Sequence, residues 1–167
     1  MVMITQMKKI IWQQFGAAID MLENALTACP EEVWGSRVGS SEFWYIAFHA
    51  LFYLDLYLSE SDQGFSPPEP FTPDELDERC LLPDRVYARQ ELLTYLAHSR
   101  AKCQKTITDM TEEQANKRSG FRWLDISVAE ILLYNMRHVQ HHAAQLNFIL
   151  SKKLGLAPRW VRKPGTL

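Results

Sequence analysis

Residues 127–150, SVAEILLYNMRHVQHHAAQLNFIL, decide the fold of this chain. Their apolar side chains recur about every three to four positions, which predicts an amphipathic α-helix. His138 and His142 are four positions apart, so they lie on one face of that helix and can aim their rings at one point. His141 lies on the flank of this face, and we expect it not to be a ligand. The two imidazoles, placed beside an apolar stripe, predict one half of a metal site.

Three other stretches carry helical patterns, and none alternates convincingly as a strand would. The helices are expected over residues 4–28, over residues 43–58, from Pro83 to about Asp109, and from a cap at Asp125 or Ser127 to about Lys153. This pattern predicts an all-α fold, an antiparallel four-helix bundle. Residues 62–82 hold four prolines and are expected to form a long crossover after the second helix, with at most one or two turns between Pro73 and Arg79.

The second helix, FWYIAFHALFYLDLYL over residues 43–58, is apolar on all sides. Such a helix is enclosed by neighbours on most sides or faces another subunit. We therefore expect a homodimer. His49 lies in the middle of this helix, where burying an imidazole costs free energy unless it has a partner.

His49 is thus the expected third ligand, and the predicted metal site consists of His49, His138 and His142. Three neutral imidazoles leave a metal ion open positions for water or substrate, as catalytic sites do. Imidazole suits zinc, nickel, copper and iron alike. Side chains that can orient the rings through their second nitrogen are expected among Asn135, Gln145, Tyr45, Tyr53 and Asp55. The opposing interpretation is that His49 is a satisfied core residue and that the other two belong to a polar face.

Composition and motifs exclude several classes of protein. The chain has 167 residues and a net charge of −2, which suits one domain over residues 1–167 and argues against nucleic-acid binding. The longest apolar run is too short to span a bilayer. Three cysteines without a C-x-x-C spacing, Cys29, Cys80 and Cys103, indicate a reducing cytoplasm. Without a glutamate after the first histidine the zinc-protease mechanism is absent, and without a Glu-x-x-His pair so is a ferritin-like di-iron centre.

The second-helix motif with its single histidine, and the run N-x-x-H-x-x-H-H-x-x-Q-L from Asn135 to Leu146, resemble the DinB/YfiT-like family. Helix lengths and a tail with Pro158 and Trp160 fit the same family. The resemblance implies a four-helix bundle, a metal site at His49, His138 and His142 that contains nickel or zinc, and a homodimer. One departure is Ala143-Ala144, where many relatives have Arg-Gly.

The resemblance implies a metal-dependent enzyme with a small-molecule substrate, and it leaves the reaction open. Some relatives are transferases or isomerases that use a low-molecular-weight thiol, and others resemble hydrolases that activate water on a metal. A carboxylate near the metal would favour hydrolysis, with Asp55 and Glu42 as the second-helix candidates. A basic pocket would favour an anionic thiol. The alternative from another class is a non-catalytic metal-binding or stress-response interaction module, and a third is a structural dimer without metal.

Overall fold

The structure is a computed structural model that describes residues 2–38, 41–79 and 82–165. Four long helices make up most of it: α1 (Val2–Ala28), α3 (Phe43–Leu56), α4 (Arg89–Asp109) and α6 (Val128–Leu154). The shorter elements are α2 (Glu31–Trp34), α5 (Glu112–Asn116), a 3-10 turn η1 (Asp74–Leu76), and two strands, β1 (Arg37–Val38) and β2 (Ser41–Glu42), that pair antiparallel. The predicted all-α class is confirmed. Cys80 lies outside the described residues.

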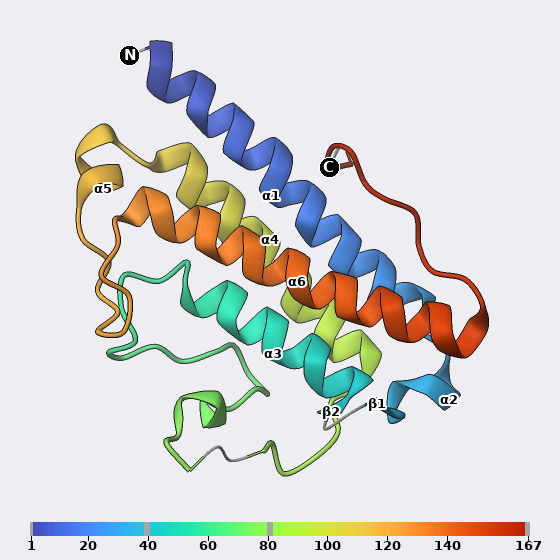
Figure 1. Cartoon of the computed structure of the whole chain (residues 1–167). Coiled ribbons are helices and arrows are strands. Elements are labelled where there is room, and N and C mark those ends of the chain that lie inside the picture. The colour runs from blue at the N-terminus through green and yellow to red at the C-terminus, as the bar shows by residue number, and fades with distance from the viewer. Residues whose placement is uncertain (1, 39–40, 80–81, 166–167) are drawn as a thin grey trace.

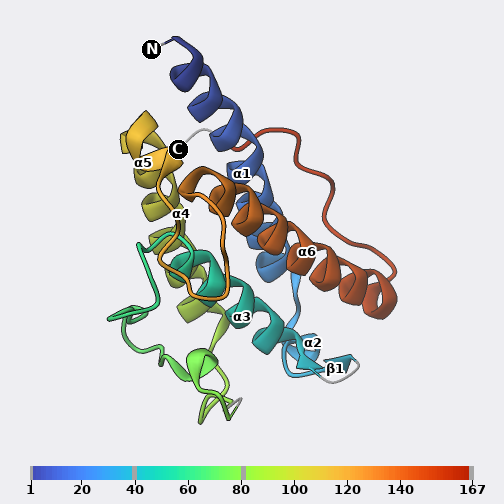
Figure 2. The same ribbon diagram turned by 60° about the vertical axis from the view of Figure 1, so that its left-hand side comes forward.

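The long helices surround one apolar core, in which α6 contacts both α1 and α3, and α4 contacts the same two helices from the other side. In Figure 1, α1 and α6 run in one direction and α3 and α4 run in the other. The turned view in Figure 2 keeps α3 and α6 side by side. Because α3 and α6 are adjacent, the helix that carries His49 lies beside the helix that carries His138 and His142.

The boundaries of α6 follow from local chemistry. Ser127 is the N-cap, and its hydroxyl oxygen accepts a hydrogen bond from the backbone N–H of Glu130 at 3.2 Å. Gly155 ends the helix with φ at 74°, a left-handed conformation that glycine adopts without a Cβ penalty. The apolar residues on the side of the helix next to the histidines are buried, namely Leu132, Val139, Ala143, Leu146 and Leu150. The helix predicted from residues 127–150 is therefore confirmed.

The predicted start of the third helix at Pro83 is wrong, because α4 begins six residues later at Arg89. Residues 82–88 instead run in an irregular path that places the Tyr87 ring in the core, 2% exposed. The Glu91 carboxylate accepts a hydrogen bond from the backbone N–H of Ala88 at 2.8 Å, which satisfies a free donor at the helix start. Packing and capping thus set the boundary beyond the proline.

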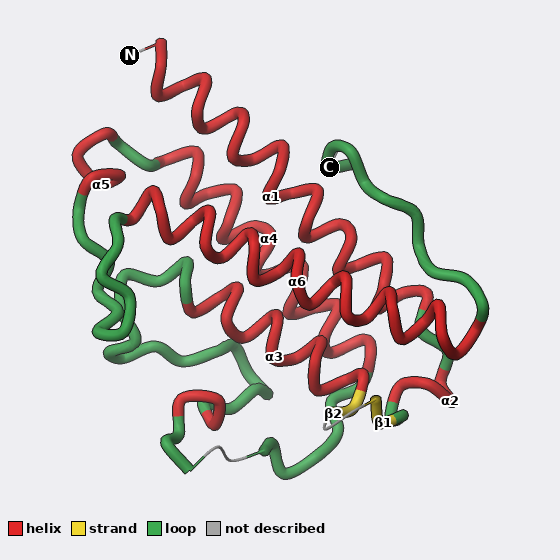
Figure 3. The backbone as a smooth tube through the Cα atoms, viewed as in Figure 1, coloured by secondary structure: helices red, strands yellow, loops and turns green. Residues whose placement is uncertain are grey.

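The long connection between α3 and α4 runs along one side of α3 (Figure 3). Phe71 stacks on Phe48 of α3 with ring centroids 5.9 Å apart, and Tyr87 lies 4.9 Å from the same ring. Ten of the fourteen residues of α3 are buried within one chain. The apolar surface from which a homodimer is expected is therefore covered by the chain itself.

Two shorter connections hold the ends of the helices. Phe121, 3% exposed, anchors the segment before α6 as expected, whereas Trp123 two residues later is 47% exposed. After α6 the chain turns back along α1, where the Gly165 backbone N–H donates to the Asp20 carboxylate at 2.7 Å (Figures 1 and 3). In the described part of the chain, none of the helices combines the length and the apolar character that crossing a bilayer requires.

Candidate metal centre

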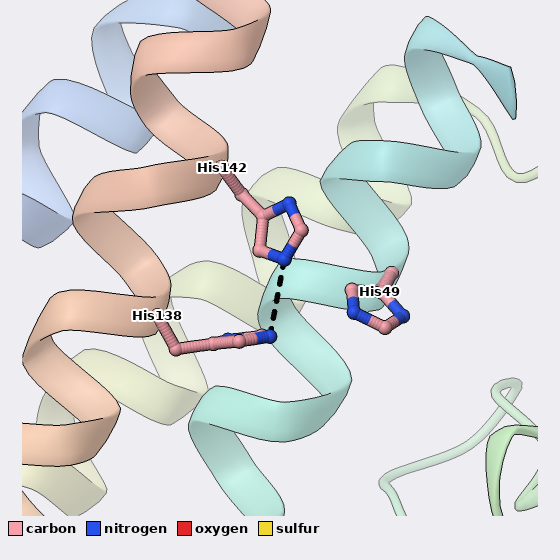
Figure 4. Close-up of side chains that lie close together, drawn as sticks. All are labelled: His49, His138 and His142. Atoms are coloured by element: carbon pink, nitrogen blue, oxygen red, sulfur yellow. Dashed lines mark hydrogen bonds between the residues drawn. The ribbon is translucent and has the colours of Figure 1, made fainter.

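The three predicted histidines meet between α3 and α6. His49, His138 and His142 each offer a ring nitrogen, and these nitrogens lie within 4.8 Å of one another. The ring centroids of His138 and His142 are 4.4 Å apart, and that of His49 lies 5.3 Å and 4.8 Å from them. Figure 4 shows one ring nitrogen of His49 directed across the gap between the helices toward the pair on α6. The interpretation of three unrelated histidines is not supported by this convergence.

Burial keeps the α6 pair neutral. The pKa of His138 is lowered to about 3, chiefly by burial and then by its proximity to His142, His49 and His141. The pKa of His142 is lowered to about 4, again chiefly by burial, although a hydrogen bond to Gln145 opposes the shift. At neutral pH both rings are uncharged, which is the state in which imidazole donates a lone pair to a metal ion.

The hydrogen bonds around His142 fix which nitrogen is available. Its Nδ1–H donates to the Gln145 amide oxygen Oε1 at 2.7 Å, so the lone pair is on Nε2. That Nε2 atom lies 3.1 Å from Nε2 of His138, which donates to it (Figure 4). Gln145 therefore has the ring-orienting role that the sequence predicts for it.

The donor set fits a divalent metal ion. Two bonds of about 2.0–2.1 Å at a tetrahedral angle place their nitrogens about 3.3 Å apart, close to the 3.1 Å between the two Nε2 atoms. A neutral imidazole has one N–H, so the His138 proton that is shared with His142 leaves its Nδ1 bare. That Nδ1 atom is buried and has no hydrogen-bond partner among the described residues. The fit to a shared ion therefore depends on the distance between the two Nε2 atoms.

Glu75 is the residue of this site that the sequence did not single out. It lies in η1, in the proline-rich connection, and its carboxylate oxygen Oε2 accepts a hydrogen bond from Nδ1 of His49 at 2.7 Å. A carboxylate that holds one ring nitrogen leaves the other, Nε2, as the ligand atom. The Glu75 side chain is 5% exposed, and its second oxygen, Oε1, is buried and has no hydrogen-bond partner in the part of the chain that the structure describes. Only the crowding of acidic residues in a long connection hinted at such a role.

Several expected partners lie elsewhere. Asn135 donates its amide N–H to the Leu54 carbonyl at 2.9 Å, which ties α6 to α3 away from the histidines. The Asp55 carboxylate, 1% exposed, accepts hydrogen bonds from Tyr95 at 3.0 Å and Lys102 at 2.5 Å on α4. The expectation that Asp55 orients a histidine ring is wrong, because the rotation of α3 about its axis turns Asp55 toward α4. The other carboxylate candidate, Glu42, accepts instead from the Trp44 indole at 2.5 Å.

Tyr53 lies beside the site, where its ring packs near the histidines and its hydroxyl holds the connection that carries Glu75. Its ring centroid lies 4.8 Å from that of His49 and 5.5 Å from that of His138, and its hydroxyl donates to the Glu75 carbonyl at 3.3 Å. Tyr45 lies further away, with its ring centroid 6.4 Å from His49. The connection that carries Glu75 is thus attached to α3 at two points, His49 and Tyr53.

A cleft of about 450 Å³ opens beside the centre. His49 and His138 lie in its wall together with aromatic and acidic side chains, namely Tyr53, Tyr57, Trp123, Tyr134, Glu75, Asp77 and Glu78, and with Leu76. A larger cleft of about 660 Å³ shares His138 and Tyr134 but lies toward α1 and the C-terminal tail, without His49 and His142. The smaller cleft is the one that gives access to the cluster, and its volume suits a small molecule.

Comparison with known protein families assigns the chain. A family model described as the DinB superfamily matches residues 14–146, which is most of the chain and includes all three histidines. No curated protein sequence gives a match.

Proposed function

The chain belongs to the DinB superfamily, and we propose that it is a metal-dependent enzyme that holds a divalent ion, nickel or zinc, on His49, His138 and His142. The single observation that carries this proposal is the convergence of three ring nitrogens within 4.8 Å beside an open cleft. A structural metal site is closed by its ligands, whereas a catalytic one keeps access for a reactant. The cleft therefore favours the enzyme over the non-catalytic binding module.

When bound, the ion would supply Lewis-acid activation of a nucleophile or polarisation of a substrate carbonyl. The protein residues contribute the positioning. Gln145 and Glu75 hold the second nitrogens of His142 and His49, and each leaves one lone pair directed at the shared point. The rings of Tyr53 and Tyr57 lie beside His138, with centroids 5.5 Å and 6.3 Å away, in the wall of the same cleft.

Hydrolysis is supported better than thiol transfer among the reactions that the family resemblance implies. A carboxylate, that of Glu75, lies at the site and has one oxygen without a hydrogen-bond partner among the described residues. By contrast, neither lysine nor arginine is among the described residues that line the cleft, and a basic lining is what would favour an anionic thiol cosubstrate. We therefore place the enzyme among the hydrolases, with a transferase as the alternative.

We also propose the finer features that accompany this assignment. Residues 1–167 form one domain, a four-helix bundle in which the long connection between α3 and α4 is the crossover. The free, buried thiols of Cys29 and Cys103 favour a cytoplasmic location. A homodimer remains a proposal from the family resemblance, and the exposed apolar side chains on α6, Leu133 and Phe148, are its remaining support.

Metal analysis of protein purified without a polyhistidine tag tests the proposal. We expect about one nickel or zinc ion per wild-type chain after reconstitution, and a loss of most of it in His142→Ala. His141→Ala is the matched control, since His141 is the exposed neighbour on the same helix and lies outside the cluster. Equal, substoichiometric metal in all three proteins would refute the metal site.

Hydrolase activity needs a separate measurement. Reconstituted wild-type protein is expected to cleave members of a panel of small esters and amides, and His142→Ala to lose that activity in proportion to its metal. Transfer of a low-molecular-weight thiol to an electrophile, without hydrolysis of any panel member, would instead select the transferase alternative.

A further inference from the structure

We propose that the cleft beside the three histidines, lined as described above, binds the ammonium group of a cationic small-molecule substrate. This inference deepens the proposed function and rests on it, because it takes the cleft to be the substrate-binding part of the metal site. It assigns a chemical class to the substrate, which neither the three histidines nor family membership supplies.

Aromatic rings form one side of this cleft. Tyr53, Tyr57 and Tyr134 follow one another, with centroids 5.5 Å apart between the first two and 5.4 Å apart between the last two. Trp123 joins them through Phe121, whose ring lies 5.3 Å from Tyr57 and 5.6 Å from Trp123. Ring faces attract organic cations, and a group of tyrosine and tryptophan rings is a recurrent binding site for quaternary ammonium groups.

The exposure of Trp123 supports a binding role. Trp123 has 47% of its surface exposed although its neighbour Phe121 is 3% exposed, so the indole is not needed to fill the core. Tyr134 is likewise 37% exposed on a helix whose other face is buried. Large aromatic surfaces that stay accessible at the mouth of a cleft favour ligand contact over packing.

Three carboxylates make up the charged part of the same lining, and none of its described residues is cationic. Asp77 is neutralised by a bidentate pair with Arg79 at 2.8 Å and 2.7 Å. Glu75 is different: its side chain is 5% exposed, one oxygen holds His49, and Oε1 is buried without a hydrogen-bond partner among the described residues. The negative charge of this carboxylate in the wall of the cleft attracts a positively charged ligand group.

The two sets of residues select for charge as well as shape. An ammonium group gains from both ring faces and carboxylates, whereas an anionic group finds a counter-charge only at the metal and is repelled by the carboxylates elsewhere in the cleft. A neutral substrate gains only apolar contact with the rings. Because a bound divalent ion lies at the histidines, the ammonium group is expected on the aromatic side of the cleft, away from the ion.

Binding of choline to the full-length, zinc-loaded protein tests this inference. The matched probe is 3,3-dimethyl-1-butanol, which has the shape of choline without its charge. Isothermal titration is expected to show choline binding at least about tenfold more tightly than this neutral probe. Choline binding no tighter than that of the neutral probe would overturn the inference.

Two tryptophan variants separate the cleft from the rest of the surface. Trp123→Ala is expected to weaken choline binding by about threefold to 30-fold. Trp160→Ala is the control, because Trp160 is 68% exposed and lines the larger cleft toward α1, whereas the lining described for this cleft does not include it. It should leave choline affinity within about twofold of wild type. An equal loss in both variants would assign choline to a non-specific surface effect and refute the proposed site.

Zinc content measured on the same samples keeps the two proposals apart. If the wild type holds zinc and His142→Ala does not, but choline fails to bind, the metal site is supported and the ammonium site is refuted. If choline binding depends on Trp123 while zinc is equally absent from wild type and His142→Ala, the metal site is refuted instead. A zinc content of Trp123→Ala equal to that of wild type shows that this variant is folded.

Discussion

Nδ1 of His49 lies 2.7 Å from Oε2 of Glu75, although 26 positions separate the two residues in the chain. Their contact joins the proline-rich connection to the centre of the most apolar helix. It also orients one ring of the three-histidine cluster, because a carboxylate that accepts from Nδ1 leaves Nε2 free to face His138 and His142. The connection is thereby part of the candidate metal site.

Replacing Glu75 is expected to weaken metal binding more than folding. Glu75→Gln removes the charge that holds the His49 proton, and loss of such a partner typically lowers metal affinity by about 10- to 100-fold. Competition with a chromogenic chelator measures the zinc affinity, and thermal unfolding of the metal-free protein measures stability.

Glu78→Gln is the control for that experiment, since Glu78 lines the same cleft from the same connection but is exposed. Its zinc affinity should stay within about twofold of wild type. If Glu75→Gln binds zinc as tightly as this control does, the orienting role of Glu75 is wrong.

Asp55 is expected to matter for stability and not for metal. Its buried carboxylate accepts from Tyr95 and Lys102. Asp55→Ala therefore removes the acceptor of a buried hydroxyl and the counter-charge of a partly buried ammonium, which keeps its bonds to the carbonyl of residue 55 and to Ser59. The expected cost in free energy of unfolding is about 2–4 kcal/mol, below the full value for a fully buried pair because Lys102 is partly exposed. Urea unfolding checks this cost.

The zinc stoichiometry of Asp55→Ala should equal that of wild type under conditions where the variant is folded. Lys102→Met gives a second view of the same interaction, since it removes the cation and keeps much of the side-chain volume. Loss of zinc from folded Asp55→Ala, with stability intact, would return Asp55 to the metal site and contradict its orientation toward α4.

The start of α4 gives a pH-dependent prediction. Hydrogen bonds from Arg85 first, and from the Ala88 backbone second, lower the pKa of Glu91 from 4.5 to about 2. A carboxylate with a lowered pKa in the folded state adds stability above pH 4.5, and that stability is lost as the pH falls toward 2, because the unfolded chain then binds the proton more readily. Because Arg85 is half exposed, the contribution at neutral pH is about 1 kcal/mol.

Glu91→Gln removes the titrating carboxylate, so the wild type is compared with this variant at each pH. Wild type should be the more stable protein at pH 7, and the difference in unfolding free energy should shrink between pH 4.5 and pH 2. Chemical unfolding at several pH values within that window measures the difference. A difference that is constant or that grows on acidification would contradict the proposed ionic contribution at the start of α4.

The sequence gives local features of this protein reliably because they depend on neighbours in the chain. The helical period places His138 and His142 on one face, Ser127 caps their helix, and Gly155 ends it. The presence of His49 within an apolar helix made it the third candidate, and the structure brings it to the pair. The third helix was predicted six residues too early, since Tyr87 packs into the core in place of continuing a helix.

Apart from Gln145, which lies one turn along the same helix as His142, tertiary structure decided what surrounds the three histidines. The rotation of α3 about its axis sends Asp55 to α4 and His49 to α6, and an all-apolar helix carries no stripe from which that rotation can be read. Likewise the path of the proline-rich connection brings Glu75 to His49. The same chain buries most of α3, the apolar helix from which a second subunit is expected. Periodicity fixes relations within one helix, whereas the packing of residues far apart in the chain fixes which helix and which loop each face meets.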